Sequence, residues 1–162
     1  MPTVHEGPES RLAPGDHELL RLWLRLFTCA SMIERILGSR LKKEFGSTLP
    51  RFDLLAQLER APAGLRMQEL SSRLLVTGGN VTWLVSSLVK EGFVTRTRAT
   101  DDGRSAIVKL TAPGRRYFTR MARAHGEWVA ELLQDVPAAE RVRLNGMLGI
   151  IKGSLHLREE RE

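Results

Sequence analysis

The side chains that most often carry catalysis or bind metals are few and scattered in this sequence. Cys29 is the only cysteine, so the chain can form no intramolecular disulfide, which fits a reducing cytoplasm. Gly78-Gly79 lacks the Lys-Ser/Thr pair of a phosphate-binding loop. No pair of histidines has the spacing of a zinc site; they are His5, His17, His125 and His156. We therefore expect no enzymatic activity and no metal or other cofactor.

Polar side chains gather instead on one side of a short segment between Gly79 and Glu91. Four apolar residues recur there at helical spacing and predict a buried stripe: Val81, Leu84, Val85 and Leu88. The opposite side carries Asn80, Trp83, Ser86, Ser87 and Lys90. Such a face can form hydrogen bonds and ring contacts with another molecule. Gly92 follows where a left-handed residue commonly ends a helix.

A second short helix is expected immediately before this one. Leu70 and Leu74 lie four residues apart in the segment from Met67 to Leu75. Residues 76–79 then read as a tight turn, in which the Thr77 hydroxyl can cap the following helix. Two short helices joined by a tight turn, the second with a polar outer face, predict a helix-turn-helix.

A β-hairpin is expected directly after the helix-turn-helix. Val94–Arg98 and Ser105–Leu110 alternate in polarity, and Asp101-Asp102-Gly103 between them is a strong turn signal. Three arginines lie at its tip and flanks, namely Arg96, Arg98 and Arg104. A hairpin in this position is a wing, and its arginines suit the negative potential of a DNA minor groove.

The positive charge of the chain is concentrated in this same region. Residues 62–120 contain ten basic and four acidic side chains, which accounts for the whole net charge of +6. The remaining residues contain fifteen of each sign. Localised positive charge is typical of a surface that meets a polyanion.

Long helices are expected on both sides of the helix-turn-helix and wing. We expect a flexible tail over 1–15, a helical dimerisation region over 16–48 and 112–158, and a DNA-binding domain over 49–111. The last helix should bury Val142, Leu144, Leu148, Ile151 and Leu155. No apolar run approaches the roughly 20 residues of a membrane helix, and residues 1–15 lack the apolar core of a secretion signal. The prediction is a cytoplasmic, mainly α-helical protein with a small β-hairpin wing.

The sequence resembles the MarR family of bacterial regulators over roughly residues 17–157. The matching segments are Met67-Gln-Glu-Leu-Ser-Ser-Arg-Leu, residues 80–96, Asp102-Gly-Arg-Ser, and Lys109-Leu-Thr with Gly114 three residues on. The family usually has Asp-Arg-Arg in the wing, whereas Gly103 replaces the first arginine here. Arg104 keeps the second arginine, so a contact through position 103 is lost or moved.

The resemblance implies a regulator, expected to be a repressor, that binds double-stranded DNA as a homodimer through a pseudo-palindromic operator. Thr77, Gly79, Asn80, Thr82, Trp83 and Ser86 fall where the family's recognition helix meets the major groove, whose edges distinguish all four base pairs. Arg73, Lys90, Arg96 and Arg98 are expected to hold phosphates, and Arg104 to enter a groove.

The resemblance also implies a small aromatic, anionic effector whose binding lowers DNA affinity. The expected apolar walls of its site are Trp23, Phe27, Phe45, Phe52 and Trp128, with Arg25 or Arg40 for the anion. Plain core packing is the alternative for each aromatic residue. Residues 22–27 together with 49–55 look similar to the branch that controls hydroxycinnamate and other aromatic acid catabolism, where the effector can be a coenzyme A thioester.

Two other functions stay open at this point. Some members of the family sense oxidants through a cysteine in the first helix, which requires an accessible, activated thiol. Cys29 lies in a strongly apolar helix and is expected to be buried and inert. The other alternative is a helical protein-interaction module without DNA binding, although such a module would not need arginines on both flanks of a wing.

Overall fold

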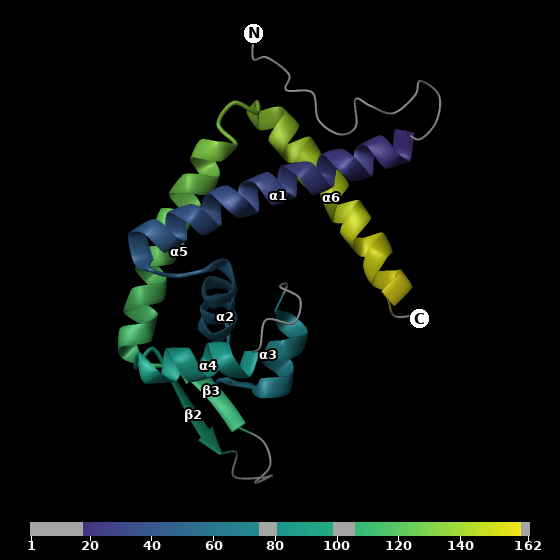
Figure 1. Ribbon diagram of the computed structural model, residues 1–162. Coiled ribbons are helices and arrows are strands. Elements are labelled where there is room, and N and C mark those ends of the chain that lie inside the picture. The colour runs from purple at the N-terminus through teal and green to yellow at the C-terminus, as the bar shows by residue number, and fades with distance from the viewer. Residues whose placement is uncertain (1–17, 75–80, 99–105, 160–162) are drawn as a thin grey trace. The chain divides into compact units, whose positions relative to one another are not determined.

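The computed structural model describes residues 18–74, 81–98 and 106–159. The chain divides into two compact units, residues 1–126 and residues 127–162, and helix α5 (Ala112–Leu132) contributes to both (Figure 1). The first unit contains every strand of the described chain and helices α1 (Glu18–Phe45), α2 (Leu49–Glu59), α3 (Met67–Arg73) and α4 (Val81–Lys90). The fold is mainly α-helical with a small antiparallel sheet, as the sequence predicts.

The sheet has three strands rather than the two expected. The hairpin strands are β2 (Val94–Arg98) and β3 (Ala106–Leu110), paired from Val94 with Leu110 to Arg98 with Ala106. A short strand, β1 (Leu65–Arg66), pairs with the other edge of β3, so the order is β1-β3-β2. Two residues are too few to show an alternating pattern, so β1 could not be predicted from local spacing. In Figure 1 the hairpin strands extend away from α4.

The core of the first unit is formed by the buried apolar faces of α2, α3 and α4 and by the inner face of the sheet. Fully or almost fully buried side chains include Leu54, Leu55, Leu58, Leu70, Leu84, Val85, Leu88, Val108 and Met121. Burial of one such aliphatic side chain contributes about 1.5–3 kcal/mol. The expected stripe of α4 is confirmed at Leu84, Val85 and Leu88, whereas Val81 is only half-buried.

The end of α4 is fixed by a glycine turn and by the start of α5. Gly92 has φ of +75°, a conformation that glycine adopts without a Cβ clash. Its N–H donates to Val89 O at 3.0 Å and that of Phe93 donates to Leu88 O at 2.9 Å, as in a Schellman motif. Thr111, directly before α5, donates its hydroxyl to Gly92 O at 2.7 Å and accepts from the Gly114 N–H at 3.0 Å. The expected end of the helix at Gly92 is therefore confirmed, and Thr111 caps the start of α5.

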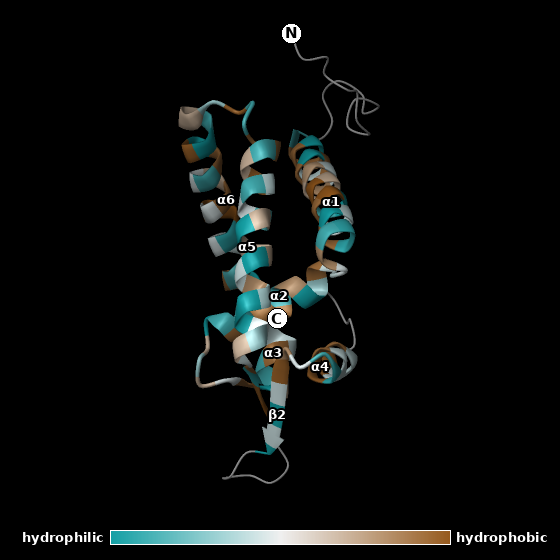
Figure 2. Cartoon of the chain, turned by 90° about the vertical axis from the view of Figure 1, so that its left-hand side faces the viewer, coloured by the Kyte–Doolittle hydropathy of each residue, from teal (hydrophilic) through white to brown (hydrophobic). Residues whose placement is uncertain are grey.

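Helix α1 is buried only toward its C-terminal end. Leu37 and Leu41 are buried, whereas Leu19, Leu22, Trp23 and Phe27 are exposed. Figure 2 shows hydrophobic residues along this helix into its N-terminal half. In the described part of the chain the N-terminal half of α1 has no fully buried residue, although Leu24 and Leu26 are half-buried.

The second unit holds the end of α5 and helix α6 (Ala138–Glu159). Arg141 donates to Val136 O at 2.8 Å and to Leu133 O at 3.3 Å, which satisfies carbonyls at the turn between the two helices. No residue of α6 is buried. The expected burial of Val142, Leu144, Leu148 and Leu155 is wrong for a single chain, since these side chains are exposed; Ile151 is half-buried.

None of the described helices is both long enough and apolar enough to span a bilayer.

Candidate nucleic-acid interface

The outer face of α4 is open to solvent. Trp83 is 62% exposed, and Thr82 and Lys90 are also exposed. Ser86 is half-buried. The prediction that Trp83 points away from the buried stripe is confirmed, because Leu84, Val85 and Leu88 occupy the inner side of the helix. A large flat ring is thus presented on the surface of a short helix, among hydroxyl groups and one cation.

Strand β2 presents two of the predicted arginines beside α4. Val94 is buried at the start of the strand, whereas Arg96 and Arg98, two and four residues further on, are exposed. Side chains two apart lie on the same face of a strand, so the two guanidinium groups form one short row. In the described part of the chain neither has an ion pair or side-chain hydrogen bond, and both can therefore bind an external anion.

Arg73 lies at the end of α3 and is exposed. Its guanidinium is 4.0 Å from the carboxylate of Glu69, four residues earlier on the helix. An exposed ion pair with so long a distance between the charged atoms contributes little to stability. The Arg73 guanidinium can therefore exchange it for a contact with a phosphate. Four further predicted contacts, Thr77, Gly79, Asn80 and Arg104, lie outside the described residues.

An ion pair that the sequence did not reveal fixes the other end of α4. Arg51, on α2, donates from both terminal nitrogens to the Glu91 carboxylate, at 2.8 and 2.5 Å. Ser87 Oγ donates to the same carboxylate at 3.1 Å. The hydrogen bonds from Arg51 are the largest of the effects that hold the pKa of Glu91 below its usual value. Arg51 and Glu91 lie 40 residues apart, and no local pattern signals such a pair.

The residues expected to line an effector site do not form one group in the described chain. Trp23 and Phe27 contact each other on α1, with ring centroids 5.6 Å apart, and both are exposed. Phe45 lies 22 residues beyond Trp23 on the same helix, a separation of about 33 Å at 1.5 Å per residue. One small molecule cannot contact Trp23 and Phe45 of the same chain.

The other aromatic candidates have packing partners of their own. Phe52 stacks on His125 at 4.5 Å and contacts Phe118 at 5.5 Å. Partial burial lowers the pKa of His125, which favours a neutral ring in this stack. Trp128 is buried and belongs to the second unit. Arg25 and Arg40 both lie on α1.

Cys29 is exposed, so the expectation that it is buried is wrong for a single chain. Like Trp23 and Phe27, it lies in the N-terminal half of α1, where no described residue is fully buried. Among the described residues, no group of three or more histidine, cysteine, aspartate or glutamate side chains could hold a metal ion.

Helices α2 to α4 followed by an antiparallel hairpin define a winged helix-turn-helix. A family model described as "MarR family" matches residues 45–105. A MarR family transcriptional regulator from Silicibacter pomeroyi is similar in structure, with a TM-score of 0.76 and 34% sequence identity over 89% of this chain and 99% of the other. The chain belongs to the MarR family.

Other relatives are consistent with this family. The transcriptional regulator Sco3205 from Streptomyces coelicolor, solved in complex with DNA, has a TM-score of 0.72 and 25% identity over 83% of this chain and 88% of that chain. The uncharacterised regulator YkoM of Bacillus subtilis is 31% identical over 63% of this chain. The transcriptional activatory protein BadR of Rhodopseudomonas palustris is 30% identical over 63% of this chain. The matched segments span 66% of YkoM and 59% of BadR.

Proposed function

We propose that this chain is a transcription regulator that binds double-stranded DNA. The observation that carries the proposal is the exposed outer face of α4, with Trp83 and Thr82, beside the arginine row of β2. A helix of this size fits a major groove, where base edges differ for all four pairs. Arg96 and Arg98 supply cations for the phosphate backbone. The relative from S. coelicolor, which was solved in complex with DNA, supports DNA binding as the proposed function of this chain.

Base readout is assigned to α4 and to the residues shortly before it, and backbone contacts to the basic residues around it. Thr82, Trp83 and Ser86 would face base edges together with Thr77, Gly79 and Asn80. Arg73, Lys90, Arg96 and Arg98 would hold phosphates, and Arg104 would enter a groove from the wing. Phosphate contacts position a protein on the duplex, whereas base contacts specify the sequence.

The regulator would act as a homodimer. A single recognition helix reads few base pairs, and two-fold dimers of such domains bind half-sites about 34–36 Å apart. Helix α1 exposes Leu19, Trp23 and Phe27, and helix α6 exposes Val142 and Ile150. Large exposed apolar side chains mark surfaces that another protein covers. A second copy of the chain would cover these surfaces through residues 16–48 and 112–158.

Repression relieved by a small aromatic anion, including an acyl-coenzyme A thioester, is the mode of action that the resemblance favours. An effector of this kind must bind the DNA-free conformation more tightly than the DNA-bound one. Oxidation of Cys29 is the second candidate switch, and the exposure of this thiol favours it. If Cys29→Ser leaves a response to peroxide unchanged, the redox switch is excluded.

Fluorescence anisotropy with labelled DNA from upstream of the protein's own gene tests the proposal. At fixed salt, we expect tighter binding to this DNA than to a scrambled duplex of the same length. Trp83→Ala should reduce that preference, whereas the control Val89→Ala, on another side of α4, should not. Equal affinity for both duplexes would instead favour a protein-interaction module. Titration with aromatic acids and their coenzyme A thioesters then tests the effector.

A further inference from the structure

Helix α4 presents one large aromatic side chain near its beginning. Trp83 is the third residue of the helix and is 62% exposed. In a helix-turn-helix the N-terminal residues of the recognition helix are those that contact base edges. Ser86 and Ser87 share a side of α4 with Trp83, because residues three and four apart lie on one face of a helix. Both are small, so the indole ring is the largest group on the outer face.

The chemistry of the indole ring restricts what it can recognise on a base edge. Its single polar group is the Nε1–H, which can donate a hydrogen bond but cannot accept one. The ring therefore has nothing to offer the amino groups of adenine and cytosine. Its large apolar face gains most when it excludes water against another apolar group. In the major groove the apolar group of a base edge is the C5-methyl of thymine.

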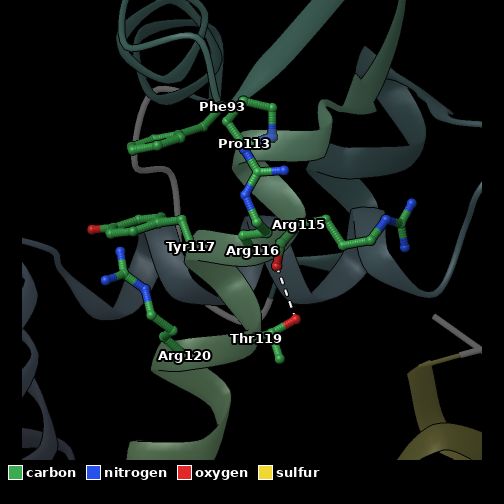
Figure 3. Close-up of a pocket in the computed structure, with 7 residues that line it drawn as sticks. All are labelled: Phe93, Pro113, Arg115, Arg116, Tyr117, Thr119 and Arg120. Atoms are coloured by element: carbon green, nitrogen blue, oxygen red, sulfur yellow. Dashed lines mark hydrogen bonds between the residues drawn. The ribbon is translucent and has the colours of Figure 1, made fainter.

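The packing at the far end of α4 favours such a contact, because it fixes the helix that carries the ring. Phe93, just beyond the end of α4, stacks on Tyr117 with centroids 4.3 Å apart and planes 3° from parallel, as Figure 3 shows. The Tyr117 hydroxyl donates to Phe45 O at 2.9 Å, which holds this ring in turn. An indole on a fixed helix has only its two side-chain torsions to order when it binds, so the entropy cost of the contact is small.

We propose that Trp83 specifies a thymine in each half-site, through contact of its indole face with the C5-methyl group. This inference rests on the proposed function and names the residue that selects one base within it. Selection at this position is for a methyl group and not for a pattern of hydrogen bonds. Thr82 and Ser86 differ, because a hydroxyl both donates and accepts and therefore distinguishes base edges less sharply. Thr82 also has a methyl group, which makes it the competing reader of thymine.

Uracil tests the contact, since it pairs with adenine as thymine does and lacks only the C5-methyl. We would use the full-length protein to select a tightly bound duplex from a random pool, and then prepare that duplex with thymine and with uracil throughout. Fluorescence anisotropy at fixed salt gives the two affinities. We expect the native protein to bind the uracil duplex at least about threefold more weakly, because burial of one methyl-sized group is equivalent to about that factor.

Substitutions of Trp83 show which group is responsible for the difference. Trp83→Ala should bind the two duplexes equally. Trp83→Phe keeps an aromatic face without the N–H, and it should retain most of the native difference. The control is Val89→Ala, on another side of α4, which should retain the whole difference. Any effect of uracil on the shape of the duplex acts on every variant, so the comparison between variants removes it. Circular dichroism melting confirms that each variant is folded.

A difference between the duplexes that survives Trp83→Ala would overturn the assignment. So would equal affinity of the native protein for both duplexes. Loss of the difference in Thr82→Ser, with Trp83→Ala unaffected, would assign the thymine contact to the threonine methyl instead. Failure of the proposed function gives a separate result: the native protein then enriches no duplex from the pool, and the role of Trp83 falls with it.

Discussion

Gly114 is a position where the backbone leaves no room for a side chain. A Cβ placed there would lie 1.9 Å from Phe93 O and 2.7 Å from Phe93 C. The obstacle is main chain, which cannot rotate away as a side chain can. This close approach gives a physical reason for the glycine of the Leu-Thr-x-x-Gly segment.

We expect Gly114→Ala to lower the free energy of unfolding by more than the roughly 1–3 kcal/mol typical of overpacking, because the start of α5 must move away from Phe93. Thermal unfolding followed by circular dichroism measures the effect. Gly126→Ala is the control, since nothing lies within 4 Å of its added Cβ and it lies inside α5. It should be neutral or stabilise by up to about 1 kcal/mol. Equal melting temperatures for the two variants would contradict the argument.

Substitution of Arg98 tests whether the two exposed arginines of β2, Arg96 and Arg98, contact phosphate. If it does, Arg98→Gln should weaken binding to all duplexes by a similar factor and reduce the salt slope of log affinity by about one unit. Anisotropy titrations at several salt concentrations, on the upstream and scrambled duplexes, give both quantities. A loss confined to the upstream duplex would show instead that Arg98 reads base edges.

At the scale of elements, the orientation of α4 depends on its tie to α2. The carboxylate of Glu91 receives both ends of the Arg51 guanidinium, and Ser87 adds a third hydrogen bond. A bidentate pair of this kind restricts angle as well as distance. We infer that the pair helps to hold the outer face of α4, which is proposed to read a groove, in one orientation.

The pair should also produce a pH dependence of stability. Because the folded protein holds the pKa of Glu91 below its ordinary value of 4.5, the contribution is present above pH 4.5. It is lost as the pH falls through the lowered, folded-state pKa. We expect Glu91→Gln to be less stable than the native protein at pH 7, with a difference that shrinks below pH 4.5. Urea unfolding at pH 7 and at acidic pH measures it; a constant difference would contradict this assignment. The effect should be modest, since Glu91 is partly exposed.

The elements that the sequence predicted well are those with local signals. The stripe of α4, the glycine after it and the hairpin strands were all indicated by spacing within about a dozen residues. The strand β1 was missed because it is two residues long. The pair of Arg51 with Glu91 was missed because it depends on tertiary structure.

At the scale of the whole molecule, the exposed apolar residues of α1 and α6 are the main departure from expectation. The apolar pattern predicted burial at Val142, Leu144, Leu148 and Leu155 and at Cys29, yet one chain leaves them exposed. Hydrophobic spacing tells which side chains prefer burial but not which molecule buries them. The proposed homodimer would account for both helices.

Ile150→Glu tests that proposal. Ile150 is 75% exposed, so the substitution should be tolerated within one chain. It should disrupt association, because a buried interface would have to accommodate an unpaired charge. Sedimentation velocity should show a dimer for the native protein and a monomer for the variant, with weaker DNA binding by the latter. Asn145→Glu, which adds the same charge at an exposed polar position, should remain dimeric. A native protein that sediments as a monomer would exclude the homodimer.

The hydrogen bonds of Thr111 join the segment that ends α4 to the start of α5. Its hydroxyl and N–H both reach the segment that ends α4, at Gly92 O and Phe93 O, while its hydroxyl also starts α5. Gly114 brings the main chain of α5 against Phe93 directly. We therefore expect the start of α5 and the end of α4 to move together as one rigid piece. A tilt of the start of α5 would then change the orientation of the face of α4 that is proposed to read DNA.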